Sequence, residues 1–215
     1  MAATAQRLKA LLNRLPEGVT LVAVSKFHPL EQVREAYDAG QRVFGESRAD
    51  ELVAKAQAMP EDVEWHFIGH VQTNKLRRIM PHVDVIQSVD SERLLRLISA
   101  EAVRLGREVG VLLQVHVAAE ETKTGLLPDE LPAVAEVGAT LPGVRILGVM
   151  GMASNVDDEE RILADFRAIA RCGGQLRAII PSATVLSMGM SDDWPLAVSA
   201  GSNMVRVGTD IFGPR

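Results

Sequence analysis

The chain has 215 residues, of which 47% are hydrophobic and 24% are charged, and its formal net charge is −5. These values are typical of a globular protein with one domain, spanning residues 1–215. The charges form no basic run that could follow a phosphate backbone, which disfavours nucleic acid or an anionic membrane as the main partner. No apolar run approaches the roughly 20 residues needed to span a bilayer.

Two features of the sequence bear on the cellular compartment. Residues 1–7 lack the hydrophobic stretch of a signal peptide. Cys172 is the only cysteine, so an internal disulfide is excluded and a reducing compartment is indicated. We expect this thiol to pack in the protein rather than to act as a nucleophile. The sequence therefore predicts a cytoplasmic protein.

In chain order, the apolar pattern alternates between helical and extended spacing. Helical spacing predicts helices over about 4–14, 29–39, 49–59, 73–80, 91–105, 128–137, 157–172 and 193–200. Short apolar runs predict strands over about 21–26, 42–47, 65–70, 84–90, 109–117, 144–150, 184–187 and 204–207. The polar stretch 120–125, with Glu120, Glu121 and Lys123, is expected to be a solvated loop.

Strands that alternate with helices indicate an α/β fold with a parallel sheet and right-handed crossovers. Eight such units in this length fit a single (β/α)8 barrel of the TIM type with an extra N-terminal helix. An open, doubly wound sheet is the alternative. In a barrel, functional residues belong at the C-terminal ends of the strands. The residues expected there are Lys26, Ser47, His70, Gln87, His116, Met150, Ser187 and Gly208.

Lys26 ends the apolar run Leu21-Val-Ala-Val-Ser-Lys26, which is typical of a strand buried on both faces. Because side chains alternate along a strand, Lys26 shares a face with Val22 and Val24. An ammonium group in such a place must be paired, lose its proton or be used covalently. A lysine with a lowered pKa is a nucleophile toward carbonyl groups. The alternative is that Lys26 leaves the strand and reaches solvent.

The loops after the last two predicted strands are rich in small residues. Residues 186–193 read Leu-Ser-Met-Gly-Met-Ser-Asp-Asp, and Gly208-Thr209 follow the final strand. Small residues expose backbone N–H groups, and Ser187 and Thr209 add hydroxyls. Barrels often bind phosphate at these two loops, so we expect a phosphate site here, with ordinary turns as the alternative. Ser191 precedes the start of the next predicted helix, as any N-cap serine does.

Arg206 lies inside the apolar run 204–207 and shares a face with Met204 and Gly208. If the neighbouring valines face the helices, the guanidinium points into the mouth of the barrel. A buried guanidinium needs an acceptor such as a ring nitrogen, or else a salt bridge to Glu46 or Asp90. His66 and His70 share strand parity and could both point inward. No carboxylate stands at ligand spacing from them, which disfavours a metal site.

The chain resembles the pyridoxal 5′-phosphate (PLP) homeostasis proteins, relatives of the N-terminal barrel of alanine racemase. The matching stretches run in order across nearly the whole chain. They are 21–26, Val43-Phe-Gly-Glu46, Trp65-His-Phe-Ile-Gly-His-Val-Gln-Thr-Asn-Lys75, 88–91, Leu186-Ser-Met-Gly-Met-Ser-Asp-Asp193 and 204–213. The third and fifth stretches are the most specific to the family. The resemblance implies a barrel of PLP-binding fold type III with the cofactor at its mouth.

Site residues follow from the resemblance position by position. Lys26 looks like the lysine that forms the internal aldimine, and Arg206 looks like the arginine that faces the pyridine nitrogen. Ser187, Gly208 and Thr209 look like the phosphate ligands, and Met188 lies in the same motif. Ser47 stands where the family commonly has asparagine close to the cofactor, and it offers a shorter hydroxyl in place of an amide.

Three functions are compatible with these residues. The first is a monomeric PLP carrier that serves homeostasis, with apo-enzymes as recipients and without strong catalysis of its own. The second is a PLP-dependent, racemase-like enzyme of low activity. The third is a Schiff-base lyase acting on a phosphorylated sugar without PLP, with Lys26 as nucleophile and Glu46 as general base.

Two points favour the carrier over the racemase. Alanine racemase takes its second base, a tyrosine, from a separate C-terminal domain. This chain ends at Arg215, and Tyr37, its only tyrosine, falls on a predicted helix away from the strand ends. An arginine also stays protonated, so Arg206 would give the ring nitrogen a hydrogen bond but no proton. The ring is then a poorer electron sink.

Overall fold

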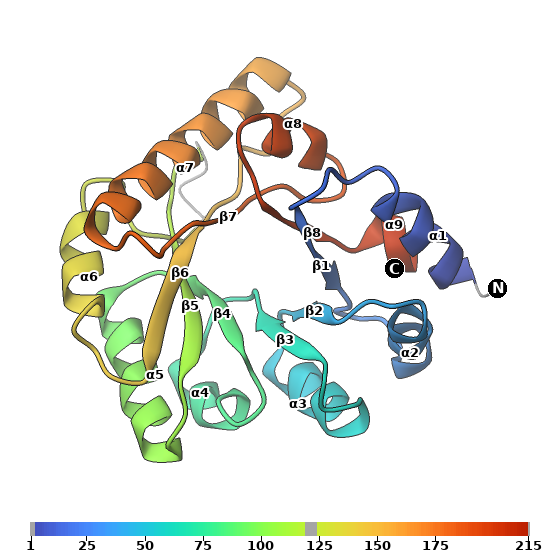
Figure 1. Cartoon of the computed structure of the whole chain (residues 1–215), viewed down its shortest axis with the longest axis horizontal. Helices are drawn as coiled ribbons and strands as arrows, with labels where there is room; N and C mark the ends of the chain where they lie inside the picture. Colours follow the sequence, from blue (N-terminus) through green and yellow to red (C-terminus); the bar gives the residue numbers. More distant parts are fainter. Residues whose placement is uncertain (1–2, 119–123, 215) are drawn as a thin grey trace.

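The computed structural model describes residues 3–118 and 124–214. The expected solvated loop around Glu120, Glu121 and Lys123 lies largely outside the described residues. Eight parallel strands follow one another around a closed barrel in the order of the sequence, with β8 paired to β1 (Figure 1). They are β1 (Thr20–Val24), β2 (Val43–Glu46), β3 (Glu64–Phe67), β4 (Val85–Val89), β5 (Val109–Gln114), β6 (Val144–Met150), β7 (Val185–Ser187) and β8 (Met204–Val207). The predicted barrel is confirmed, and the open sheet is excluded.

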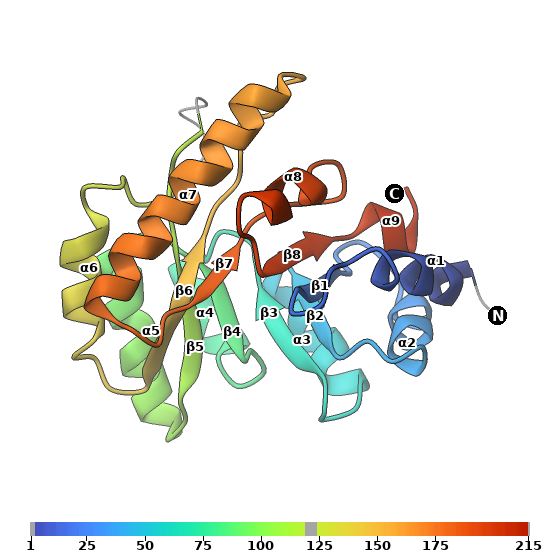
Figure 2. The same cartoon turned by 45° about the horizontal axis from the view of Figure 1, so that its top comes forward.

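Helices form a ring outside the strands (Figure 1). They are α1 (Ala3–Leu12), α2 (Leu30–Asp38), α3 (Ala49–Ala58), α4 (Thr73–Ile79), α5 (Glu92–Leu105), α6 (Leu131–Gly138), α7 (Glu159–Ile179), α8 (Trp194–Ser199) and α9 (Thr209–Phe212). The extra N-terminal helix α1 packs beside α9 (Figure 2). Arg7 Nε donates to the carbonyl of Ile211 over 2.7 Å. Because α9 is only one turn long, α1 completes the ring at the place where the chain closes on itself.

Several strands are shorter than the sequence predicts. The pairing of β1 with β2 ends at Val24 and Gly45, so Lys26 lies in the turn that follows β1. Helix α7 is longer than expected and continues through Gly173 to Ile179. The glycine lets the helix pack closely against β7, because a Cβ at position 173 would collide with Leu186. No helix within the described residues is long and apolar enough to cross a membrane.

Alternation along the strands separates two apolar layers. The inner cluster fills the barrel and contains Val22, Val85, Leu112, Met150 and Met204. The larger outer cluster lies between the sheet and the helices and includes Phe44 and Met188. Strand parity therefore places Arg206 on the inner face with Met204, and Glu46 on the outer face with Phe44.

Candidate functional site

A cavity of about 240 Å³ opens at the C-terminal ends of the strands. Lys26 contributes from the turn after β1, Arg206 from β8, and Gly208 and Thr209 from the start of α9. Ser191 enters from the loop between β7 and α8. The remaining lining residues are Val24, His28, Ile68, Met150, Met152, Met190 and Asp192. The cavity thus combines an amine, a guanidinium and hydroxyl groups with apolar walls from Val24, Ile68 and three methionines.

Contacts from α3 fix the turn that carries Lys26 on both sides. The carbonyl of Ser25 accepts a hydrogen bond from Lys55 Nζ over 2.7 Å, and the N–H of Phe27 donates to Glu51 Oε2 over 2.7 Å. Phe27 has a φ of 67°, in the left-handed region that a bulky residue rarely adopts. Such backbone persists only where its surroundings impose it. The contacts from α3 therefore hold the turn in the conformation in which Lys26 lines the cavity.

Behind this turn, Glu46 and Lys55 form a buried ion pair. Lys55 Nζ lies 2.6 Å from Glu46 Oε1, and the Ser25 hydroxyl donates to the same oxygen over 2.6 Å. Burial raises the pKa of Glu46, while the charge of Lys55 acts in the opposite direction. Glu46 lies in the outer layer and does not line the cavity. The expectation of Glu46 as a general base next to the Lys26 amine is therefore wrong.

Arg206 is 5% exposed, and its guanidinium is held by the neighbouring strands. Nη1 donates to the carbonyl and the hydroxyl oxygen of Ser187 over 2.7 and 2.8 Å, and Nη2 donates to the carbonyl of Gly151 over 3.0 Å. Burial lowers the pKa of Arg206 to about 10, opposed by the charge of Asp193. The group therefore remains a cation and a pure donor at neutral pH.

The alternative of a salt bridge from Arg206 to Glu46 or Asp90 is wrong. The carboxylate of Glu46 is taken by Lys55, and Asp90 lies 3.4 Å from His70. The hydrogen-bond acceptors of the Arg206 guanidinium are instead the neutral carbonyl and hydroxyl oxygens of Ser187 and the carbonyl oxygen of Gly151.

Three expected cofactor-binding residues lie away from the cavity. The Ser187 hydroxyl is fully buried inside the barrel, where it donates to Gln87 Oε1. Met188 packs in the outer layer, and its N–H and carbonyl bond to Met204 and Ser202. Ser47 lines a separate pocket with His70. Contrary to the expectation, these three side chains do not line the cavity that contains Lys26.

Ser191 is the hydroxyl that sequence reasoning assigned to another role. The N-cap of α8 is Asp193 and not Ser191, and Asp193 Oδ1 accepts the N–H of Met190 over 2.6 Å. Burial raises the pKa of Asp193, and its bond to the Met190 N–H acts in the opposite direction. This contact holds the loop so that Ser191 lines the cavity beside Gly208 and Thr209. Capping propensity gave no signal for this arrangement, because the Asp193 carboxylate bonds back to Met190 and makes no capping bond to α8.

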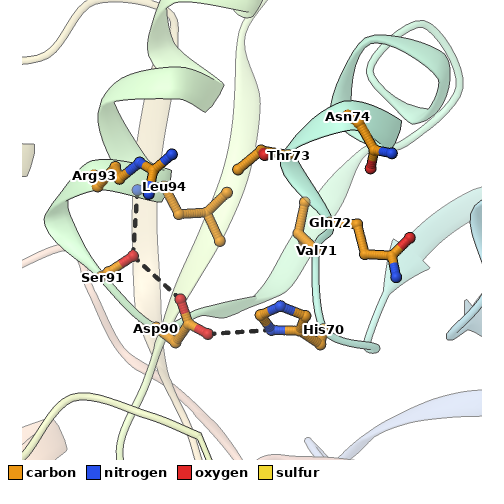
Figure 3. Close-up of a pocket in the computed structure, with 9 residues that line it drawn as sticks. All are labelled: His70, Val71, Gln72, Thr73, Asn74, Asp90, Ser91, Arg93 and Leu94. Atoms are coloured by element: carbon orange, nitrogen blue, oxygen red, sulfur yellow. Dashed lines mark hydrogen bonds and ion pairs between the residues drawn. The ribbon is translucent and has the colours of Figure 1, made fainter.

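A second pocket of about 500 Å³ adjoins the ends of β3 and β4 (Figure 3). His70 lines this pocket, with its Nδ1 3.4 Å from Asp90 Oδ2 and 60% of its side chain exposed. Asn74 lines the same pocket, while Lys75 lines the adjacent one with Ser47. His66, by contrast, is buried and bonds to Gln87. The two histidines therefore diverge, and no cluster suited to a metal ion occurs among the described residues.

The closed barrel, with a lysine after β1 and an arginine on β8, can be compared with known proteins. A family model described as alanine racemase, N-terminal domain, matches residues 1–215. The pyridoxal phosphate homeostasis protein of Vibrio alginolyticus is 40% identical, over 94% of this chain and 89% of its own length. That of Schizosaccharomyces pombe is 38% identical, over 92% and 85%. The chain belongs to the alanine racemase N-terminal domain family and, within it, to the pyridoxal phosphate homeostasis proteins.

Solved structures agree with this placement. PipY of Synechococcus elongatus PCC7942 without PLP is 40% identical and superposes with a TM-score of 0.93, covering 98% of this chain and 100% of PipY. The same protein with PLP bound gives a TM-score of 0.90. Alanine racemase of Clostridium difficile is 15% identical with a TM-score of 0.78, over 99% of this chain and 56% of the racemase. This last likeness shows the fold alone.

Proposed function

We propose that this chain, a single barrel domain over 1–215, binds PLP at the mouth of the barrel and serves intracellular PLP homeostasis. The observation that carries the proposal is the convergence of Lys26, Arg206 and Thr209 on one cavity. An amine suits the aldehyde of PLP, a guanidinium suits its ring nitrogen, and hydroxyls suit its phosphate. The relatives bear the same functional name, and PipY has been solved with PLP bound.

Each group of the cavity receives one task in this proposal. The ε-amine of Lys26 holds the aldehyde carbon covalently with loss of water, and Arg206 donates a hydrogen bond to the ring nitrogen. Thr209, Gly208 and Ser191 hold the phosphate. A Cβ at position 208 would lie 3.0 Å from the carbonyl oxygen of Val24, so a glycine lets this backbone pass close to β1. Titration of the purified protein with PLP, followed by visible absorption, tests the proposal. A PLP-binding protein should develop the visible absorption band of a Schiff base between Lys26 and PLP, whereas a sugar lyase that works without PLP should not.

Removing the two hydroxyls at the cavity, with Ser191→Ala and Thr209→Val together, should weaken PLP more than pyridoxal. A hydrogen bond to a charged group contributes about 1.5–3 kcal/mol, so each loss should cost PLP at least about tenfold in affinity. Pyridoxal has no phosphate and should lose little. Ser187→Ala is the matched control, because its hydroxyl serves Arg206 and should affect both ligands alike. Equal loss of both ligands in the double variant would show that these residues do not bind phosphate.

The proposed role excludes strong catalysis by the loaded protein. Tyr37 lies on α2 with its hydroxyl 2.6 Å from Asp62, which precedes β3 at the opposite end of the barrel. It therefore stands far from the cavity and supplies no second base there. Arg206 gives the ring a hydrogen bond without a proton, which leaves the cofactor a weak electron sink.

We expect the loaded protein to exchange the Cα proton of alanine far below an enzyme's usual turnover of about 1 to 10³ per second. The measurement is deuterium uptake at Cα in heavy water, followed by NMR, with free PLP at the same concentration as reference. Uptake in the enzymatic range on an ordinary amino acid would replace the carrier by a racemase-like enzyme. Slow uptake with ready transfer of PLP to an apo-enzyme would support the carrier.

We also propose the recipients of PLP, the oligomeric state and the cellular compartment. Apo-forms of PLP enzymes are the recipients, and the protein acts as a monomer in the cytoplasm. The buried Cys172 is compatible with a reducing compartment. The exposed large apolar side chains among the described residues come from different helices and loops, apart from Leu97 and Val103, which both lie on α5, and this supports a monomer. They are Leu12, Phe27, Leu97, Val103, Leu127, Val156 and Met190.

A further inference from the structure

A chain of buried polar side chains runs through the interior of the barrel. Arg206 Nη1 contacts Ser187 Oγ at 2.8 Å, and Ser187 Oγ contacts Gln87 Oε1 at 2.6 Å. Gln87 Nε2 lies 2.6 Å from His66 Nδ1, and His66 Nε2 lies 2.8 Å from Glu64 Oε1. Ser187 and Gln87 are fully buried, and His66 is 1% exposed. The remainder of the described barrel interior is mainly apolar, so this chain is costly to bury unless every member is satisfied.

The donor-only chemistry of Arg206 and the orientation of the Gln87 amide, with Oε1 toward Ser187 and Nε2 toward His66, together set the direction of the bonds. A guanidinium only donates, so the Ser187 oxygen accepts from it and the single Ser187 hydrogen goes to Gln87 Oε1. The amide of Gln87 then turns its NH2 group toward His66.

His66 Nδ1 must accept this bond, which leaves the ring neutral with its proton on Nε2. That proton is donated to Glu64, and the bond lowers the pKa of Glu64, as expected for an ionised acceptor. Donors therefore point one way through the barrel, from the guanidinium to the carboxylate.

The two ends of the chain lie at opposite ends of the barrel. Arg206 lines the cavity that contains Lys26, at the C-terminal end of β8. Glu64 is the first residue of β3, and half of its side chain is exposed at the other end. Both hydrogens of Arg206 Nη1 are used by Ser187, and one of Nη2 is used by Gly151. The guanidinium is thus locked in one orientation before any ligand arrives, which lowers the entropic cost of binding.

We propose that Gln87 and His66 are positioning residues for the ring of the bound cofactor, because they act through Ser187 to fix the Arg206 guanidinium toward the ring nitrogen. This inference rests on the proposed function. It assigns a role to two barrel residues that are not among those lining the cavity.

The test compares PLP with 1-deaza-PLP, in which a C–H replaces the ring nitrogen. Gln87→Met keeps the length of the side chain and removes both polar atoms, so the Ser187 hydroxyl loses its acceptor. We expect the affinity for PLP to fall about tenfold or more, and the affinity for the deaza analogue to stay within about twofold, because only PLP accepts from Arg206. Pyridoxal, which keeps the ring nitrogen, should lose as much as PLP.

Two further comparisons separate positioning from general destabilisation. Gln41→Met is the matched control: this glutamine is also buried, but its Nε2 donates to the carbonyls of Leu21 and Val43. It should lower thermal stability without changing the preference between the two ligands. At position 66, Asn retains an acceptor near the place of Nδ1 and should preserve the preference for PLP, whereas Leu should lose it.

The outcomes are distinct. Equal loss of both ligands in Gln87→Met, or an unchanged preference in Gln87→Met and His66→Leu, would overturn the positioning role. If Gln87→Met fails to fold, His66→Leu against His66→Asn carries the comparison. Failure of the wild-type protein to bind PLP would instead reject the proposed function.

Discussion

Replacing Lys26 with alanine should abolish covalent retention of PLP while the barrel stays folded. Lys26 is the lysine among the residues that line the cavity, and its turn is held by backbone contacts to Lys55 and Glu51 that do not involve its side chain. The free energy of unfolding should therefore change by about 1 kcal/mol or less. Borohydride reduction of the PLP-loaded protein, followed by peptide mass spectrometry, should show a pyridoxyl group on Lys26 in the wild type and none in the variant.

Lys75→Ala is the control for this experiment. Lys75 lies on α4 beside a neighbouring pocket, 3.8 Å from Asp50, and it should be unmodified in the wild type. Its removal should leave the adduct on Lys26 intact. A reduced adduct that remains in Lys26→Ala at wild-type yield, on Lys75 or any other lysine, would contradict the assignment of the nucleophile.

Lys55→Met should produce the largest loss of stability. The substitution leaves the Glu46 carboxylate fully buried without its cation, and Glu46 Oε2 has no hydrogen-bond partner among the described residues even in the native protein. Breaking a buried pair from one side costs about 3–5 kcal/mol. Urea unfolding measures this cost. The double variant Lys55→Met with Glu46→Gln should regain part of the loss, because the uncompensated charge is gone.

The loss should also depend on pH in a defined direction. Burial already raises the pKa of Glu46, and removing Lys55 takes away the charge that opposes this rise. A carboxyl whose pKa is higher in the folded than in the unfolded state binds more protons when folded. The stability of Lys55→Met should therefore fall as the pH rises through the raised pKa, and recover as the pH falls.

Lys75→Met provides the surface comparison, because its partner Asp50 is 67% exposed. Exposed pairs contribute about 0–1 kcal/mol, so this variant should remain close to the wild type at every pH. A loss in Lys55→Met no larger than in Lys75→Met would show that the buried pair does not stabilise the turn that carries Lys26.

The order of the helices and strands, and the strand ends that carry reactive groups, could be predicted from local sequence patterns. Alternating periodicity predicted eight strands and the N-terminal helix, because each period is set locally by which residues face an apolar layer. It also predicted that Lys26 and Arg206 share a face with buried residues, since strand parity needs no knowledge of the partner strands. Both residues line the cavity, as expected because functional sites of such barrels lie at the C-terminal ends of the strands.

Which face of each strand points into the barrel became clear only from the folded arrangement of the strands. In a parallel barrel both faces are apolar, so the pattern Phe44-Gly-Glu46 does not show that Glu46 faces the helices. Strand β7 has only three residues, too few for parity to place Ser187 in the interior beneath Arg206. Closure of the barrel also brought Gln87 of β4 within 2.6 Å of Ser187 of β7. A contact between residues 100 positions apart depends on strand stagger and barrel closure, which no local pattern encodes.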